Sequence, residues 1–361
     1  MSQYDFASLG LNTALVDNLE SLGYTEMTPV QAQGLPPILA NKDVIAKAKT
    51  GSGKTATFAL GLLNKLQVKR FRVQTLVLCP TRELADQVSV EIRKLARGIH
   101  NIKVLTLCGG MAFGPQVGSL EHGAHIIVGT PGRVEEHLRK AHLNLDNLTT
   151  LVLDEADRML DMGFQEALDN IISYMPDERQ TLLFSATYPS KIEKIAQRIM
   201  RSPVTVEVQD SHSNQSIVQT LYQVESDDSR IEAVRLLLQA HQPETTLIFC
   251  NTKVETDQVA NELRAVGYEA LALHGDLEQK QRDQTLVRFA NRSASVLVAT
   301  DVAARGLDID ALDLVINYQV ARELEVHTHR IGRTGRAGAQ GIACTLHTQK
   351  ENHKIGLLED Y

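Results

Sequence analysis

The segment Ala48–Thr55 carries the residues with the clearest chemistry. It reads Ala-Lys-Thr-Gly-Ser-Gly-Lys-Thr and lies between an apolar run, Val44–Ala46, and a helix-favouring stretch, 56–66. Glycines let successive N–H groups point inward, and a helix start adds its own free N–H groups. Lys54 can then reach the β- and γ-phosphates of a nucleotide, and the Thr55 hydroxyl can hold magnesium. The predicted phosphate cradle consists of Thr50, Gly51, Ser52, Gly53, Lys54 and Thr55.

A second segment, 151–157, is an apolar run that ends in acidic residues. Magnesium keeps its waters and prefers carboxylate oxygens, so Asp154 would hold the ion through water. Glu155 is the candidate to orient or deprotonate an attacking water. Acidic residues after a strand are often only solvated loop charges. The phosphate cradle earlier in the chain favours the catalytic interpretation.

Composition limits the classes of protein to which the chain can belong. Its 361 residues suggest two domains, and 43% hydrophobic and 22% charged residues are ordinary for a globular protein. The net charge of −7 argues against a uniformly basic surface. Four scattered cysteines fit neither a zinc site nor a disulfide framework and predict free thiols in a reducing compartment. The sequence shows no signal peptide or long apolar stretch, so we expect a cytoplasmic protein with no membrane partner.

Short apolar runs alternate with helical stretches, which indicates a parallel sheet covered by helices on both faces. The polar stretch 209–215 is interpreted as a linker, so we expect two α/β domains, 1–208 and 216–361. Only the first has a phosphate cradle, which predicts an active site between the domains, at the carboxyl ends of strands. The predicted strands are Val44–Ala46, Leu76–Cys79, Val104–Leu107, His125–Val128, Leu151–Leu153, Leu182–Phe184, Leu247–Cys250, Ala270–Leu273, Val296–Ala299 and Leu314–Asn317.

Residues 154–157 read Asp-Glu-Ala-Asp and, together with the phosphate cradle, resemble the DEAD-box RNA helicase family. Further segments match the family's motifs, in the family's order, over nearly the whole chain. The resemblance implies two RecA-like domains joined by a short linker, with ATP and Mg²⁺ as cofactors and RNA as partner. The matching segments are Thr28–Gln31, Pro80–Ala85, Gly109–Gly110, Thr130–Arg133, Ser185–Thr187, Leu247–Thr252, Gln279 with Arg282, Ala299–Asp301, Gly306–Asp308 and His329–Arg336.

The resemblance also implies roles for single residues. The Gln31 amide both donates and accepts, which suits the edge of adenine, and either Phe6 or Tyr24 could stack on the ring. Ser185 and Thr187 would couple hydrolysis to strand separation. The expected contacts to the RNA backbone are Arg82, Gly110, Thr130, Arg133, Arg282 and Thr300.

The second domain would contribute positive charge to catalysis. Arg333 and Arg336 are three residues apart and share one helical face, so both suit an arginine finger aimed at the γ-phosphoryl group. Asp308, in the segment that begins at Gly306, would accept from ribose hydroxyls or help to place the water. His329 would bridge the closed domains. Because these residues belong to the second domain, hydrolysis should require the two domains to close.

The predicted function is RNA-stimulated ATP hydrolysis coupled to local, non-processive separation of short RNA duplexes by a monomer. Within the family the chain is most similar to the bacterial DbpA-type branch, which acts on large-subunit ribosomal RNA, and the resemblance lies in Leu107–Gly110, His274–Gln279 and Asp283–Asn291. Ribosome-assembly factors are therefore possible partners. That branch has a further RNA-binding domain, which we do not find before Tyr361. An ATP-gated RNA clamp and a DNA-directed helicase remain alternatives. Gln319 departs from the family, which usually has Asp there.

Overall fold

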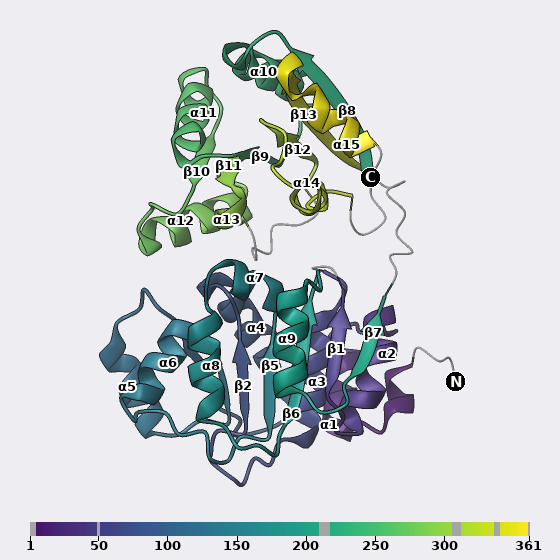
Figure 1. Cartoon of the computed structure of the whole chain (residues 1–361), viewed down its shortest axis with the longest axis vertical. Helices are drawn as coiled ribbons and strands as arrows, with labels where there is room; N and C mark the ends of the chain where they lie inside the picture. Colours follow the sequence, from purple (N-terminus) through teal and green to yellow (C-terminus); the bar gives the residue numbers. More distant parts are fainter. Residues whose placement is uncertain (1–4, 49–50, 209–216, 305–311, 336–339, 360–361) are drawn as a thin grey trace. The chain divides into compact units, whose positions relative to one another are not determined.

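The computed structural model describes residues 5–48, 51–208, 217–304, 312–335 and 340–359 (Figure 1). The chain divides into two compact units, Met1–Gln209 and Asp210–Tyr361, which we call the N-terminal and C-terminal units. Five sequence predictions fall outside the described residues: Thr50, Gly306, Asp308, Arg336 and the linker 209–215.

The N-terminal unit is built on a parallel sheet with strand order β3-β4-β2-β5-β6-β1-β7. Its strands are β1 (Val44–Lys47), β2 (Thr75–Leu78), β3 (Val104–Leu107), β4 (Ile126–Gly129), β5 (Thr150–Leu153), β6 (Gln180–Ser185) and β7 (Val204–Glu207). Its helices are η1 (Phe6–Leu9), α1 (Thr13–Ser21), α2 (Pro29–Leu39), α3 (Lys54–Lys65), α4 (Arg82–Leu95), η2 (Ala96–Gly98), α5 (Phe113–Glu121), α6 (Pro131–Arg139), α7 (Ala156–Asp161), α8 (Gln165–Ser173) and α9 (Ser190–Ile199).

Helices cover both faces of this sheet (Figure 1). Successive residues of each central strand point to opposite faces. In β1, Val44 and Ala46 belong to one hydrophobic cluster and Ile45 belongs to the other. In β5, Val152 belongs to the first cluster and its neighbours belong to the second. Burial on both faces explains why these strands are nearly continuous apolar runs.

The C-terminal unit repeats the plan with strand order β10-β11-β9-β12-β13-β8, again with every described pair parallel. Its strands are β8 (Ile217–Val224), β9 (Thr246–Cys250), β10 (Ala270–Leu273), β11 (Val296–Thr300), β12 (Leu314–Asn317) and β13 (Gly341–Thr348). Its helices are η4 (Asp227–Ser229), α10 (Arg230–His241), α11 (Lys253–Ala265), α12 (Gln279–Ala290), α13 (Asp301–Ala304), α14 (Leu324–Ile331), η5 (Gln349–Glu351) and α15 (Asn352–Glu359). Among the described helices of the two units, none is long and apolar enough to cross a membrane.

The predicted fold class, two parallel sheets each flanked by helices, is confirmed, and each of the predicted strands is present within about two residues at its ends. The sequence analysis missed β7, β8 and β13. β7 and β8 are edge strands with exposed residues, and they lack the apolar run of a strand buried on both faces. In β13 the apolar run is interrupted by Thr345 and His347.

Most of the predicted site residues follow the carboxyl end of a strand. In the N-terminal unit they come at or after the ends of β1 to β6, and in the C-terminal unit at or after the ends of β10, β11 and β12. Parallel strands bring all their carboxyl ends to one edge of the sheet, so residues far apart in sequence meet there. Each unit therefore has one edge that gathers polar side chains.

Candidate nucleotide and RNA sites

The phosphate loop has the backbone that its glycines predict. Gly51 has φ +79° and Gly53 has φ +95°, and α3 begins directly afterwards at Lys54. A Cβ atom on Gly53 would lie 2.8 Å from both Gln31 Nε2 and Thr28 Oγ1. Glycine is thus favoured at position 53 for two reasons. The backbone there is left-handed, and residues of α2 and its N-cap approach too closely for a Cβ atom.

Lys54 and Asp154 form the buried charged centre of this edge. The Lys54 side chain is 6% exposed, and its Nζ has no hydrogen-bond partner among the described residues. Asp154 is 3% exposed, and burial raises the pKa of its carboxyl to about 6, while the nearby Lys54 ammonium lowers it. A buried ammonium without a partner is costly, and a nucleotide phosphate would supply the missing acceptors. The residues present therefore fit a nucleoside triphosphate with its magnesium ion.

Glu155 is held in an uncommon backbone conformation. It has φ 50° and ψ 52°, in the left-handed region, and it precedes α7. Its N–H donates to Asp154 Oδ1 at 3.0 Å, and its carboxylate accepts from Arg158 Nη1 at 3.1 Å. A non-glycine residue keeps such a backbone only when its surroundings enforce it, and such residues cluster at active sites. The role of Glu155 on the attacking water stays a prediction.

Asp157 connects the acidic segment to the segment after β6. Its Oδ2 accepts from the Thr187 N–H at 2.9 Å and from Thr187 Oγ1 at 2.8 Å, and its own N–H donates to Ser185 Oγ at 3.3 Å. The Ser185 carbonyl accepts from the N–H of Ala48 at 3.1 Å, at the start of the phosphate loop. The sequence alone predicts no role for Asp157. Its position as the fourth residue of Asp-Glu-Ala-Asp was the available signal.

Gln31 contacts the phosphate loop directly. It is 2% exposed, and its Nε2 donates to the Gly53 carbonyl at 3.4 Å. Phe6 is 3% exposed within a hydrophobic cluster and packs edge-on against Tyr24, with ring centroids 6.3 Å apart. The Tyr24 hydroxyl donates to Glu91 at 2.6 Å, and burial together with that carboxylate raises its pKa. Recognition of adenine by these residues stays a prediction.

Arg133 has partners within the protein for its Nε, Nη1 and Nη2. Nη1 and Nη2 each donate to the Met111 carbonyl at 3.1 Å, Nη1 also donates to Gln116 at 3.0 Å, and Nε lies 3.2 Å from Glu136. Met111 follows Gly110, which has φ +76°. Arg133 therefore fixes the loop that presents Gly110, in addition to the phosphate contact that the sequence predicts.

Thr130 and Arg82 lie on neighbouring segments of the same edge. Thr130 Oγ1 accepts from the Gly109 N–H at 3.4 Å, so the segments after β3 and β4 touch. Arg82 begins α4 after β2, and its Nε lies 3.5 Å from Asp86. The structure thus places the predicted RNA residues of this unit along the ends of three adjacent strands.

In the C-terminal unit, Arg330 joins three strand ends. It is 1% exposed, pairs with both oxygens of Asp301 at 2.6 and 2.7 Å, and donates to Asn251 Oδ1 at 2.8 Å and the Gln319 carbonyl at 2.9 Å. These partners follow β11, β9 and β12. Arg330 lies within the predicted motif His329–Arg336, but the sequence predicts no role for it.

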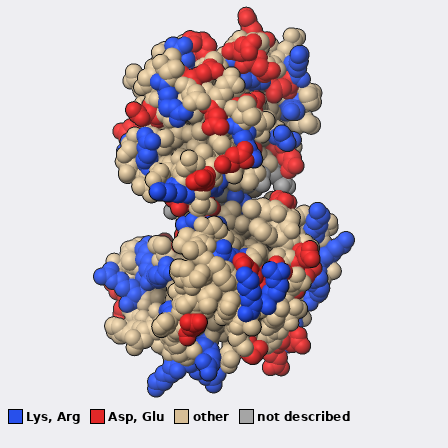
Figure 2. Space-filling model, turned by 90° about the vertical axis from the view of Figure 1, so that its left-hand side faces the viewer, with Lys and Arg blue, Asp and Glu red and all other residues tan. Residues whose placement is uncertain are grey.

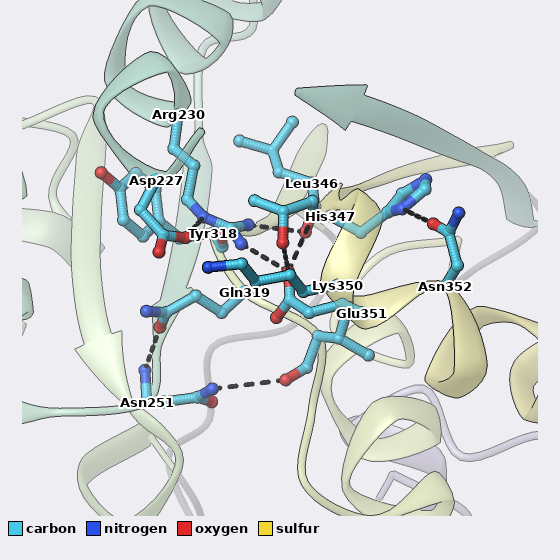
Figure 3. Close-up of polar contacts among 12 residues, drawn as sticks. Asp227, Arg230, Asn251, Tyr318, Gln319, Leu346, His347, Lys350, Glu351 and Asn352 are labelled. Carbon is cyan, nitrogen blue, oxygen red and sulfur yellow. Dashed lines mark hydrogen bonds and ion pairs between the residues drawn. The ribbon is translucent and has the colours of Figure 1, made fainter. Parts of the chain in front are cut away.

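Gln319 takes part in the same network through its side chain (Figure 3). Its Oε1 accepts from the Asn251 N–H at 3.0 Å, and its Nε2 donates to Glu255 in the first turn of α11. Asn251 Nδ2 in turn donates to the Val320 carbonyl at 3.3 Å. The amide at position 319 thus has a donor and an acceptor in use, and an aspartate would have only acceptors.

Arg230 holds the far side of this loop in place (Figure 3). It is 1% exposed, and its Nη1 donates to the carbonyls of Tyr318 at 2.7 Å and Leu346 at 2.9 Å. Asp227 and Glu351 supply the compensating carboxylates. The ends of β12 and β13 are therefore connected to the start of α10 by a second buried arginine.

The remaining predicted residues of this unit surround the network. Thr300 is 9% exposed at the end of β11, and Arg333 is 6% exposed. Arg333 lies in a turn after α14 ends at Ile331, so the prediction that it sits on a helical face is wrong, because the helix stops before it. His329 lies in α14 and is partly buried. Arg282, in α12, donates to the His274 carbonyl at 3.5 Å.

Comparison with known proteins identifies the family. Residues 28–195 match the DEAD/DEAH box helicase family, and residues 229–338 match the helicase conserved C-terminal domain. The chain belongs to the DEAD-box helicase family. It is 55% identical over 350 residues to ATP-dependent RNA helicase DbpA of Escherichia coli, covering 97% of this chain and 76% of that protein. It is 43% identical over 354 residues to DEAD-box ATP-dependent RNA helicase CshA of Geobacillus kaustophilus, covering 98% of this chain and 76% of that protein.

Solved structures agree with this assignment. Saccharomyces cerevisiae Dbp5 bound to RNA and ADP BeF3 matches with a TM-score of 0.89 and 29% identity, over 99% of this chain and 93% of that one. Mss116p bound to single-stranded RNA and AMP-PNP matches with a TM-score of 0.87 and 29% identity, over 98% of this chain and 76% of that one. The DEAD-box helicase described here is accordingly an ATP-hydrolysing enzyme with two RecA-like domains that acts on RNA.

Proposed function

We propose that this DEAD-box helicase separates short RNA duplexes locally and non-processively. The observation that carries the proposal is the hydrogen bonding of Asp157 to Ser185 and Thr187, which joins the nucleotide edge to a neighbouring strand end. A change at the γ-phosphate would reach the segment after β6 through these bonds.

Binding of ATP would use the phosphate loop and the acidic segment of the N-terminal unit. Lys54 would contact the β- and γ-phosphates, and Thr55 with Asp154 would hold Mg²⁺, which supplies charge neutralisation at the phosphates when bound. Glu155 would orient the attacking water and accept its proton. Gln31 would select adenine, since its amide edge lies against the loop at Gly53.

Hydrolysis would require the domain 216–361 to meet the domain 1–208. Arg333 and Arg336 would place their guanidinium groups on the γ-phosphoryl oxygens, where an arginine finger is worth about 10³–10⁵ in rate. Asp308 and His329 would complete the closed site, with the segment from Gly306 beside the nucleotide. The fixing of α14 by Arg330 supports this proposal, because it positions the backbone that leads into Arg333.

Contacts to RNA would go to the sugar–phosphate backbone. They would be made by Arg82, Gly110, Thr130 and Arg133 of one domain and by Arg282 and Thr300 of the other. Such contacts carry no sequence code, and the 2′-hydroxyl would distinguish RNA from DNA. A strand held by both domains in a bent form cannot remain paired, so its complement leaves. ATP would drive closing, and hydrolysis would release the RNA.

A duplex-release assay tests this function. We expect release of an RNA duplex of about 10 base pairs with ATP, a steep fall in release as the duplex is lengthened, and no release of a DNA duplex. Release of long and short duplexes at equal yield would contradict local separation. RNA binding with ATP but without any release would instead identify an ATP-gated clamp.

The natural RNA substrate is a second part of this proposal. We propose large-subunit ribosomal RNA, in the cytoplasm, with the helicase acting as a monomer alongside ribosome-assembly factors. The similarity to DbpA supports the RNA, and the four free, buried cysteines suit a reducing compartment. Fragments of large-subunit RNA should stimulate ATP hydrolysis at lower concentration than unrelated RNA of equal length, at one fixed salt concentration. Equal stimulation of ATP hydrolysis by both RNAs would contradict large-subunit ribosomal RNA as the natural substrate.

A further inference from the structure

The loop 66–74, between α3 and β2, is a concentrated basic surface on an acidic protein. It contains Lys69, Arg70 and Arg72 and no acidic residue, while the whole chain has a net charge of −7. All three cations are exposed. Among the described residues, no carboxylate lies within 4 Å of their nitrogen atoms to neutralise them. Figure 2 shows that Lys and Arg side chains gather in groups on the visible face of the N-terminal unit.

Gln74 fixes the shape of this loop from inside. It is 6% exposed; its Oε1 accepts from the Gln67 N–H at 3.0 Å, and its Nε2 donates to the carbonyls of Gln67 at 2.9 Å and Arg70 at 2.7 Å. His125, which is fully buried, holds the Val68 carbonyl at 3.0 Å. These hydrogen bonds from buried polar side chains to the loop backbone indicate a loop with one defined conformation.

Phe71 packs against His125, one of the two buried residues that bond to this loop. Its ring packs edge-on against His125, with centroids 4.6 Å apart, yet the residue is 43% exposed. Beneath it lies Gly123, where a Cβ atom would come within 2.7 Å of the ring. The protein thus supports one side of an aromatic ring and leaves the rest open between Arg70 and Arg72. An aromatic ring among arginines is suited to stacking on a nucleic-acid base.

The loop lies at the opposite end of β2 from a predicted RNA segment. β2 is four residues long, so its first and last Cα atoms are about 10 Å apart. The loop precedes Thr75, and Pro80–Ala85, with Arg82, follows the strand. An RNA that is held at the carboxyl edge of the sheet could also reach the amino edge with a flanking helix.

We propose that the loop 66–74 is a second RNA-binding site of this helicase. Lys69, Arg70 and Arg72 contact backbone phosphates of RNA outside the strand that the carboxyl edge holds, and Phe71 stacks on an unpaired base. The inference rests on the RNA helicase function and adds to it an anchor for structured RNA. It assigns to the loop no part in ATP hydrolysis.

The test compares two RNAs in ATPase assays on the full chain. One is a single strand of about 10 nucleotides, and the other is the same strand joined to a hairpin of about 16 base pairs. For K69Q/R70Q/R72Q we expect the KM for the hairpin RNA to rise about tenfold at about 0.1 M salt, with a weaker salt dependence. The KM for the short strand and both kcat values should stay unchanged. F71L keeps an apolar side chain over Gly123 and should raise the KM for the hairpin RNA about fivefold.

R97Q/K191Q/K194Q, in η2 and on the exposed side of α9, removes the same number of exposed positive charges and is the matched control. An unchanged KM for the hairpin RNA in the loop variant would overturn the proposal. So would an equal rise for both RNAs, or an equal rise in the control. Failure of the helicase function itself would look different, because neither RNA would then stimulate the unsubstituted protein.

Discussion

The two units bury charge at corresponding edges of similar sheets but satisfy it differently. In the N-terminal unit, Lys54 is buried with no hydrogen-bond partner among the described residues. In the C-terminal unit, Arg230 and Arg330 are almost fully buried, and each is bonded to carboxylates and carbonyls of the protein. The first edge is therefore incomplete without a ligand. The second is complete by itself and serves as a scaffold for the residues around it.

The largest expected effect comes from removing the unsatisfied charge. We expect K54M to lower kcat for ATP at least about 10²–10³-fold, because a group that stabilises the transition state is lost. The same variant should keep or raise the unfolding midpoint without nucleotide, since a buried ammonium with no hydrogen-bond partner among the described residues is gone. ATP should no longer raise that midpoint. A large loss of stability without nucleotide would show that Lys54 is part of the scaffold and would remove the contrast between the units.

Replacing Arg330, whose charge is satisfied within the protein, should have the opposite effect on stability. R330M should lower the unfolding free energy by about 3–5 kcal/mol, because Asp301 loses its bidentate partner and several carbonyl and amide contacts are broken. R235M removes an exposed arginine that pairs with Glu232 at 2.8 Å and should cost no more than about 1 kcal/mol. Denaturant unfolding of both variants is the measurement. Equal costs would mean that the buried network adds nothing beyond a surface pair.

The pH dependence of stability should come from the N-terminal edge. Burial raises the pKa of Asp154 from its usual 3.8 to about 6. The contribution of the protonated Asp154 carboxyl to stability is fully present at pH values below its unfolded-state pKa. It is lost as the pH rises through the folded-state pKa of about 6. We therefore expect D154N to be more stable than the unsubstituted protein at pH 7, without nucleotide, by up to about 3 kcal/mol. The difference should vanish near pH 4.

A stability difference between D154N and the unsubstituted protein that stays constant between pH 4 and 8 would show that the raised pKa of Asp154 plays no part in stability.

The sequence predicts the central strands and the residues directly after them, because a strand buried on both faces must be apolar and its functional residues follow at once. It does not predict β8, which is an edge strand with exposed positions. It also gives no role to Asp157, Arg230 or Arg330, because their partners are distant. Asp157 bonds to Thr187, 30 residues away, and Arg230 bonds to Glu351, 121 residues away.

A motif can identify a functional residue before all of its contacts are known. Arg133 illustrates this, since the sequence predicts a phosphate contact while the structure adds its bonds to the Met111 carbonyl and Gln116. Only the fold shows that one guanidinium fixes the loop beside Gly110. A motif therefore predicts where chemistry occurs better than it predicts which residues hold the chemical groups in place.

The smallest expected effect comes from Gln319, which tests whether the bonded network of the C-terminal unit supports binding of RNA. Q319E keeps the acceptor for the Asn251 N–H but loses the donor to Glu255 and brings two carboxylates together. We expect the KM for RNA to rise about tenfold, which corresponds to about 1.4 kcal/mol, with kcat nearly unchanged. Q319E/E255Q should regain most of the affinity, because a glutamine at position 255 can donate to a glutamate at 319, and E255Q alone should change little. If the double variant is no better than Q319E, residues 319 and 255 do not act as a pair, and the completed edge of the C-terminal unit does not depend on Gln319.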